Sequence, residues 1–169
     1  MKLGVPIDVK ITLRYFDFSR QFAIRDVYDA LVELITNSDD SYHRLYKRQL
    51  RSEDGGDILI EICEQRKGEL SLIIIYDKAE GMTLETMREK FGDIGSLHSE
   101  AGDRGFMGRG AKDCTVLGRM IIESIKDEKY YKCELTTKPQ LILLENGRSV
   151  NEIIRERLGI ERGNGTVIR

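Results

Sequence analysis

Three polar residues that could do chemistry lie at regular spacing in the first part of the chain. Glu33, Asn37 and Asp40 are separated by four and then three residues, so a helix through this segment brings them to one side. A carboxylate can act as a general base. An amide oxygen suits a hard cation such as Mg²⁺ when a phosphorylated substrate supplies further oxygens. The same spacing is typical of the solvated side of an amphipathic helix, and geometry alone leaves both interpretations open.

A second acidic group, Asp77, directly follows an almost wholly apolar segment. If that segment is a buried strand, the carboxylate lies at its end, is partly desolvated and needs hydrogen-bond donors. The exocyclic amine of an adenine is one such donor. The residues that follow, 78–82 (KAEGM), also fit an ordinary turn in which the aspartate caps and Gly81 supplies a positive φ angle.

A glycine-rich segment, residues 105–110 (GFMGRG), precedes Ala111, Lys112 and a predicted helix. Glycines allow a backbone to approach a ligand closely, and the free N–H groups at a helix start favour phosphate. Arg109 and Lys112 would add positive charge. The segment is not a Walker A loop, and no strand precedes it as in a dinucleotide fingerprint. A flexible loop is the competing interpretation. A fourth segment, 163–166 (GNGT), has the composition of a turn.

The elements at the N-terminal end are predicted from hydrophobic periodicity. Residues 7–16 alternate imperfectly and predict a strand. Ser19 is expected to cap a helix over residues 20–47. This helix would turn an apolar stripe toward the core, at positions 24, 27, 28, 31, 35, 38, 42 and 45.

The rest of the chain predicts strands joined mostly by hairpins, with shorter helices between them. Thr83 is expected to cap a helix over 84–91, and Ser149 with Glu152 to form a capping box for a helix that ends at Leu158. The remaining predictions are a helix over 111–117 and strands over 58–64, 69–77, 119–125, 129–135, 140–145 and from 165. This pattern favours an α/β (α+β) two-layer sandwich. Its sheet is mixed and mostly antiparallel, with helices packed on one face.

Composition excludes several classes of protein. The 169 residues carry 27 Lys and Arg against 29 Asp and Glu, a formal net charge of -2. This balance disfavours nucleic-acid binding by the domain as a whole. No apolar run approaches the roughly 18 residues of a membrane span, and residues 1–10 (MKLGVPIDVK) lack the apolar core segment of a signal peptide. Three scattered cysteines, Cys63, Cys114 and Cys133, are expected to be small buried residues of a cytoplasmic protein. The length fits one domain over 1–169, and a strand at the end of the chain suggests an N-terminal fragment of a longer protein.

The four polar segments, taken in order, resemble the successive nucleotide-binding boxes of the GHKL superfamily. This superfamily comprises the ATP-binding domains of gyrase, heat-shock chaperones, histidine kinases and MutL. The matching boxes are ELITNSDDS, DKAEGM, GFMGRGAK and GNGTVI, and the resemblance spans about residues 20 to 169. The pattern is most similar to the heat-shock-chaperone-like hydrolases. It implies the Bergerat-type ATP-binding fold, with ATP and Mg²⁺ as cofactors.

The resemblance implies a role for each matching polar residue. Glu33 matches the glutamate that activates the attacking water, and Asn37 matches the asparagine that binds Mg²⁺. Asp40 matches an acidic position near the nucleotide. Asp77 matches the aspartate that binds the adenine amine, and Thr166 matches the threonine that binds adenine through water.

Two glycine-containing boxes complete the implied site. Gly81 and Met82 match the residues that line the base pocket, whereas Ala79 stands where the family usually has glycine. The lid-and-phosphate box supplies the other implied nucleotide contacts, which are Gly105, Phe106, Gly108, Arg109, Gly110, Ala111 and Lys112. Residues 92–104 resemble the lid that closes over ATP.

The resemblance implies ATP hydrolysis, because histidine kinases usually have asparagine where this chain has Glu33. A histidine-kinase-type phosphotransfer domain and a non-hydrolysing ATP-sensing module remain the alternatives. In relatives, ATP closes the lid and brings two domains together. The chain is therefore expected to form a homodimer, with a subunit contact before Ser19, and to act with downstream domains. No nucleic-acid or membrane partner is evident.

Overall fold

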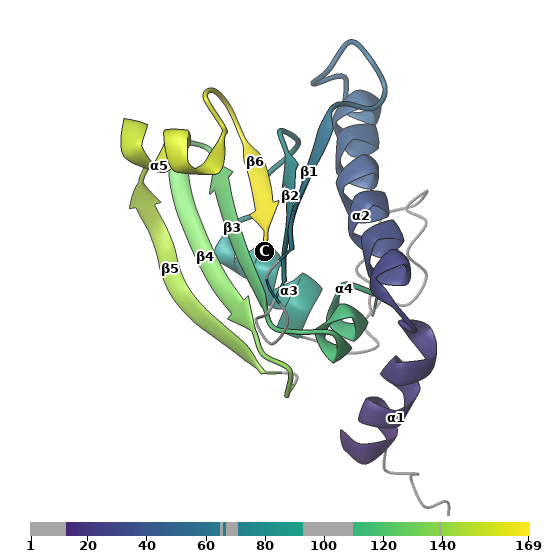
Figure 1. Cartoon of the computed structure of the whole chain (residues 1–169). Helices are drawn as coiled ribbons and strands as arrows, with labels where there is room; N and C mark the ends of the chain where they lie inside the picture. The colour runs from purple at the N-terminus through teal and green to yellow at the C-terminus, as the bar shows by residue number, and fades with distance from the viewer. Residues whose placement is uncertain (1–12, 65, 67–70, 93–109, 139) are drawn as a thin grey trace, which may run out of the picture.

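The structure is a computed structural model that describes residues 13–64, 66, 71–92, 110–138 and 140–169. A curved sheet forms its centre, and the long helix α2 lies along one side of it (Figure 1). The helices are α1 (Leu13–Ala23), α2 (Val27–Lys47), α3 (Leu84–Gly92), α4 (Gly110–Asp113), continued by the 3-10 turn η1 (Cys114–Val116), and α5 (Glu152–Leu158). The strands are β1 (Ile58–Cys63), β2 (Leu72–Asp77), β3 (Met120–Lys126), β4 (Lys129–Leu135), β5 (Leu141–Ser149) and β6 (Gly165–Ile168).

The six strands lie in the order β1-β2-β6-β3-β4-β5, and each neighbouring pair is antiparallel. The predicted hairpins β1–β2 and β3–β4 are confirmed. The second turns at Asp127 and Glu128, whose positive φ angles of 49° and 61° match a two-residue hairpin. The last strand, β6, lies between β2 and β3 and places Thr166 opposite both Asp77 and Ser124. Segments far apart in the sequence therefore meet at β6.

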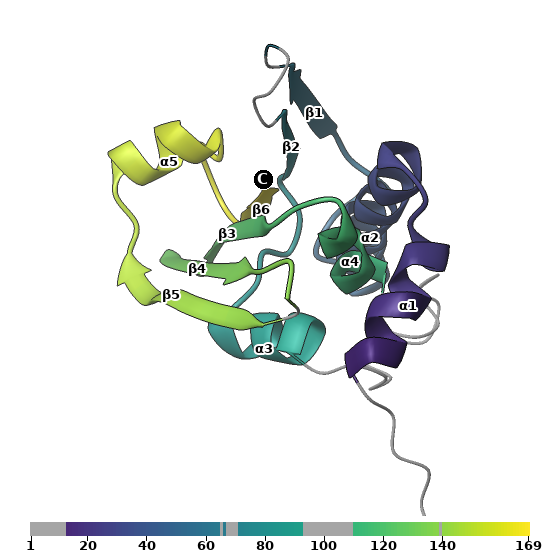
Figure 2. The same ribbon diagram turned by 60° about the horizontal axis from the view of Figure 1, so that its bottom comes forward.

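Two apolar clusters lie on opposite faces of the sheet, because successive strand residues point to opposite sides. The larger cluster joins α2, α3 and α4 to the sheet and includes Leu34, Met87 and Ile122. The smaller one joins α5 to the other face and includes Leu158 and Val167. Figure 2 shows α3 and α5 on opposite sides of the sheet. The predicted α+β sandwich is confirmed, and α5 adds a short cover to the second face.

A buried ion-pair cluster on the second face fastens the end of β6. Glu123 of β3 accepts hydrogen bonds from Tyr130 and Arg169, and Arg157 of α5 lies 2.7 Å from it. Burial acts to raise the pKa of Glu123, but the hydrogen bonds from Arg157 and Tyr130 outweigh it and leave the pKa below its usual value. The carboxylate is thus kept charged by partners on α5 and β4.

The N-terminal prediction is wrong in two respects. Residues 13–16 of the predicted strand belong to α1, and residues 7–12 lie outside the described part of the chain. The single predicted helix over 20–47 is two helices, with Ser19 inside the first. The break arises because Asp26 caps α2, where its carboxylate accepts hydrogen bonds from the N–H groups of Tyr28 and Asp29 at 2.9 and 3.1 Å. A carboxylate in this position starts a new helix.

The buried side of α2 is rotated from the predicted stripe. Val27 and Tyr28, both expected in the core, are 37% and 74% exposed. The buried residues of α2 are partly apolar and partly polar or charged. The apolar ones include Ala30, Leu34 and Tyr42, and the polar or charged ones are Ser38, Asp40 and Arg44. Part of the helix side that was expected to face solvent is therefore buried. Burial of these polar side chains favours a role for them other than keeping the protein soluble.

The predicted caps differ in outcome. Thr83 caps α3, since its hydroxyl accepts the N–H of Thr86 at 3.2 Å. The capping box at Ser149 is wrong, because Ser149 ends β5 and Asn151 caps α5 by accepting the N–H of Ile154 at 3.0 Å. The predicted end of this helix at Leu158 is confirmed.

The three cysteines are unpaired, and two of them are buried as expected. Burial raises the pKa of the Cys114 and Cys133 thiols to about 12. Cys63 is exposed, contrary to the prediction, because it ends the edge strand β1. Within the described segments, no helix combines the length and the apolar character that crossing a bilayer requires.

Candidate functional site

The first part of the candidate site joins α2 to the start of α4. Asn37 donates a hydrogen bond from Nδ2 to Oε1 of Glu33 at 3.2 Å, as expected for residues one helical turn apart. The Glu33 carboxylate lies directly against Gly110, where a Cβ atom would come within 1.9 Å of both its Cδ and its Oε1. The structure thus brings together the general-base candidate of the first box and the last glycine of the third.

The surroundings of Glu33 make its carboxyl a stronger base than usual. Burial raises the pKa of Glu33, the hydrogen bond from Asn37 lowers it, and the negative charges of Asp113 and Asp40 raise it further. The net direction is upward. A carboxylate with a raised pKa accepts a proton more readily, as long as it stays ionised at the working pH.

Gly110→Ala is expected to displace the Glu33 carboxylate. It should lower the ATP turnover that the family resemblance implies at least about tenfold, because near-ångström displacements of reacting groups are costly. The added methyl meets the far end of a flexible side chain, so the thermal stability of the fold is expected to change little. Steady-state turnover and the melting temperature measure the two effects. Gly118→Ala is the matched control, because nothing lies within 4 Å of a Cβ at Gly118. Unchanged turnover in Gly110→Ala would show that the position of this carboxylate is not critical.

The second part of the candidate site surrounds Asp77 at the end of β2. The side chain is 7% exposed and accepts hydrogen bonds from the Ser38 hydroxyl at 3.1 Å and from the N–H of Ala79 at 3.1 Å. Burial raises the pKa of Asp77 to about 6, against the lowering effect of these bonds and of the Thr166 backbone. An ionised carboxylate has about four acceptor sites, so the known partners leave capacity for a further donor.

Ser124 links the neighbouring strands to the residues after Asp77. Its hydroxyl accepts the N–H of Met82 at 2.8 Å and donates to the carbonyl oxygen of Gly165 at 2.7 Å. It also lies 3.3 Å from the hydroxyl of Thr166. The second and fourth boxes are therefore joined through β3, although the sequence separates them by more than eighty residues.

Gly81 has the glycine conformation that the turn interpretation predicted. Its φ angle is 65°, and a Cβ atom would lie 2.1 Å from the carbonyl oxygen of Ile125. Neither the backbone angle nor the space admits another residue without movement. The second box is thus packed tightly against β3.

The other predicted site residues have varied surroundings. Asp40 is buried and close enough to Glu33 to raise its pKa. Ala111 packs against the larger apolar cluster, and Lys112 is only 1% exposed. Four predicted site residues of the third box lie outside the described part of the chain, and these are Gly105, Phe106, Gly108 and Arg109. Of the predicted lid over 92–104, only Gly92 is described, as the last residue of α3.

A cleft of about 540 Å³ lies elsewhere, at the C-terminal end of α2. No predicted site residue lines it. Its lining residues are Tyr46, Lys47, Gln49, Leu50, Arg51 and Ser52.

In the described segments, no three or more His, Cys, Asp or Glu side chains are grouped so as to hold a metal ion by themselves. Asn37 is exposed and uses its Nδ2 on Glu33, so its amide oxygen suits a hard cation. A Mg²⁺ ion held here would depend on oxygens from a nucleotide, because it usually takes few protein ligands.

Sequence reasoning missed two serines of this site. Ser38 was assigned to an apolar stripe, and Ser124 lies within a predicted strand without any motif. A polar residue at a core position of each element was the available signal, because a buried hydroxyl needs partners. Those partners lie 39 and 42 residues away, beyond the reach of any local pattern.

Comparison with known proteins adds a likeness of fold. No protein-family model and no curated protein sequence matches the chain. Among solved structures, the chain is similar to the ATPase and transducer domains of DNA topoisomerase II from Balamuthia mandrillaris, with a TM-score of 0.55 and 15% identity. The match covers 84% of this chain and 36% of that chain. On this likeness, the chain has the fold of the GHKL-type ATPase domains.

Proposed function

We propose that the chain binds ATP together with Mg²⁺ and hydrolyses it to ADP and phosphate. The observation that carries the proposal is the meeting of the predicted boxes at α2. Glu33 contacts Gly110 of the third box, and Ser38 is hydrogen-bonded to Asp77 of the second. The fourth box joins them because Thr166 pairs with Asp77. The fold supports this function, since the similar solved structure is that of an ATPase domain.

Glu33 is assigned the proton transfer. Its carboxylate would accept a proton from the water that attacks the γ-phosphate, and its raised pKa suits that role. Asn37 orients the carboxylate through its 3.2 Å hydrogen bond and offers its amide oxygen to the cation. When bound, Mg²⁺ neutralises and orients the phosphate oxygens.

Asp77 is assigned the recognition of the adenine amine. In its ionised form the carboxylate accepts that donor in addition to the Ser38 hydroxyl and the Ala79 N–H. Gly81 and Met82 would line the base pocket, and Thr166 would bind the base through water. Met82 and Thr166 both contact Ser124, and Gly81 packs against the carbonyl oxygen of Ile125.

The remaining assignments concern the phosphates and the partners. Gly110, Ala111 and Lys112 would contact the phosphates, together with the third-box residues outside the described segments. Residues 92–104 would close over the nucleotide as a lid. We assign the contact between two copies in an ATP-linked homodimer to the segment before Ser19. We also propose that the protein is cytoplasmic and that hydrolysis is coupled to downstream domains of the same protein.

A thermal shift experiment tests nucleotide binding. ATP with Mg²⁺ at a hundred times its dissociation constant is expected to stabilise the fold by about 2.7 kcal/mol. For a domain of this size that corresponds to a rise in melting temperature of about 5–10 °C. Mg²⁺ alone is the control and should leave the melting temperature unchanged, because Asn37 is the only assigned protein ligand. If neither ATP nor ADP at millimolar concentration changed the melting temperature, the proposal would be contradicted. Binding without turnover would support an ATP-sensing module instead.

A further inference from the structure

The segment 78–82 follows β2 and precedes α3 without regular secondary structure, and three side chains from two elements, α2 and β3, fix it. The N–H of Lys78 donates to the Tyr42 hydroxyl of α2 at 2.7 Å. The N–H of Met82 donates to Ser124 of β3, and the Lys126 ammonium donates to the carbonyl oxygen of Glu80 at 2.8 Å. The backbone of the segment is therefore held by side chains and not by a strand ladder or a helix.

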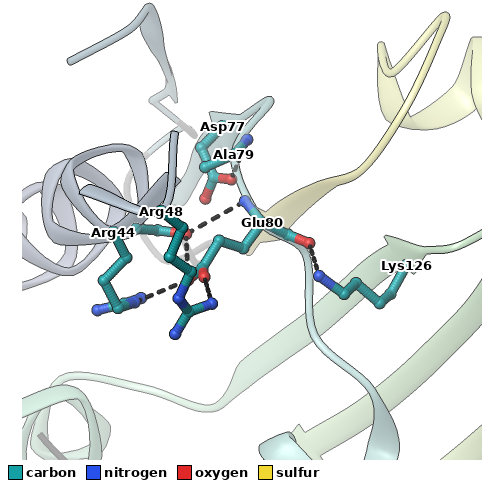
Figure 3. A network of polar contacts seen from close by, with 7 residues as sticks. Arg44, Arg48, Asp77, Ala79, Glu80 and Lys126 are labelled. Carbon is teal, nitrogen blue, oxygen red and sulfur yellow. Dashed lines mark hydrogen bonds and ion pairs between the residues drawn. The ribbon is translucent and has the colours of Figure 1, made fainter. Parts of the chain in front are cut away.

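Glu80 is the residue of this segment most strongly bonded to α2. Its carboxylate accepts the Nε–H of Arg44 at 2.7 Å on Oε2 and a guanidinium N–H of Arg48 at 2.6 Å on Oε1 (Figure 3). The Ser41 hydroxyl donates to Oε2 at 3.3 Å and accepts the N–H of Glu80 at 3.3 Å. Each carboxylate oxygen thus has its own arginine, and charge-assisted bonds of this kind are the strong ones.

In the ion-pair cluster of Glu80, Arg44 and Arg48, the first two side chains are largely buried, which restricts the movement of Glu80. The Glu80 and Arg44 side chains are 12% and 8% exposed, whereas Arg48 is 46% exposed. Largely buried charges are held in place by their partners, because unpaired charges are costly inside a protein. Glu80 therefore has little freedom to move away from α2.

The position of Glu80 relative to the base site gives the cluster a functional consequence. Glu80 directly follows Ala79, whose N–H donates to Asp77 at 3.1 Å, and directly precedes Gly81, which packs against the Ile125 carbonyl oxygen. A shift of Glu80 would move both neighbours. The first would change the hydrogen bonding of Asp77, and the second would change the floor of the assigned base pocket.

We infer that Glu80 is a positioning residue for base recognition, acting through the ion pairs that join it to Arg44 and Arg48. The inference rests on the proposed ATP-binding function, since it assigns the cluster to that same site. Glu80 is bonded to side chains at positions 41, 44 and 48, whereas Glu33 and Asn37 are bonded to each other one turn or more earlier in the helix. Its effect is therefore confined to the base end of the nucleotide and does not extend to the phosphates.

Calorimetric titration of ATP, ADP and GTP tests the inference with Glu80→Gln, which keeps the shape of the side chain and removes its charge. ATP and ADP are expected to bind about tenfold more weakly, the effect of one charged hydrogen bond. The ratio of ATP to ADP affinity stays constant, and the preference for ATP over GTP falls about tenfold. A purely structural role would weaken all three nucleotides equally. Glu156→Ala, an exposed glutamate on α5, is the matched control and should change none of these values.

The outcomes separate the inference from the proposed function. A wild-type chain that binds neither ATP nor ADP overturns the function itself. If the wild type binds ATP but Glu80→Gln keeps the wild-type preference for ATP over GTP, the proposed role of Glu80 is overturned and the proposed function stands. This holds whether the variant binds all three nucleotides as the wild type does or binds all three equally more weakly. Should Glu80→Gln fail to fold, Arg48→Ala tests the role of Glu80 through the same ratios of ATP to ADP and of ATP to GTP affinity. This half-exposed arginine can be removed with less loss of stability. A smaller loss of base preference, about threefold, is expected there.

Discussion

ATP turnover is expected to fall about a hundredfold to ten-thousandfold in Glu33→Ala, the range that a positioned general base contributes. ATP affinity is expected to stay nearly unchanged, because the carboxylate is assigned to the attacking water and not to the nucleotide. The physical basis is the half-buried carboxylate, oriented by Asn37 and held against Gly110, whose pKa is raised by burial. Phosphate release under saturating ATP measures the first effect, and calorimetry measures the second.

Two further variants make this experiment decisive. Glu33→Gln keeps the length of the side chain and cannot accept the proton as a carboxylate does, so it should lose turnover to a similar extent. Glu156→Ala on the opposite face of the sheet should turn over ATP like the wild type. If Glu33→Ala hydrolysed ATP at the normal rate, the base would have to be another group, and the assignment of Glu33 would be lost.

Asp77→Asn is expected to weaken ATP binding about tenfold to a hundredfold, the effect of losing one hydrogen bond to a charged group. The affinity of the wild type is expected to fall as pH decreases through about 6, the pKa of Asp77, because the protonated acid is a poorer acceptor. Between pH 7 and pH 5 this amounts to about tenfold. Calorimetry at pH 7 and at pH 5 measures this change in ATP affinity. The change should be absent in Asp77→Asn.

The stability of the fold provides an internal control for Asp77. Its pKa rises from the usual 3.8 to about 6 on folding, so the folded state binds more protons between these values. The contribution of this group to stability therefore falls as pH rises through that window. Asp77→Asn removes the buried charge and is not expected to lower the melting temperature at pH 7. A variant that bound ATP with wild-type affinity would remove Asp77 from the base site.

The local elements were largely predictable from the sequence. The hairpin of β1 and β2, the hairpin around Asp127 and the cap at Thr83 all depend on patterns a few residues long. Apolar alternation, turn residues and capping hydroxyls act on their near neighbours, so the sequence contains the whole signal. The wrong caps at Ser19 and Ser149 are also local errors. The residues that cap these two helices are Asp26 and Asn151, which lie a few positions further along the chain.

The sequence indicated most members of the candidate site, but it missed Ser38 and Ser124 and did not show how the members are connected. The order of Glu33, Asp77 and the glycine boxes indicated the residues, since each box carries its own composition. The contacts of Ser38 with Asp77 and of Glu80 with Arg44 join positions 39 and 36 residues apart. No local pattern records which buried hydroxyl or arginine will face which carboxylate.

By itself, the sequence determined most of the strands and helices after the N-terminal region, the hairpins, and the residue types on which the proposed nucleotide chemistry rests, because periodicity, turns and caps are local properties. Only the tertiary structure decided which side of α2 is buried, since a helix can rotate about its axis until distant partners fix it. It also decided that β6 enters the sheet between β2 and β3 and so brings Thr166 to Asp77. That strand order depends on pairing across the whole chain, and the free energy of such pairing is not contained in any one segment.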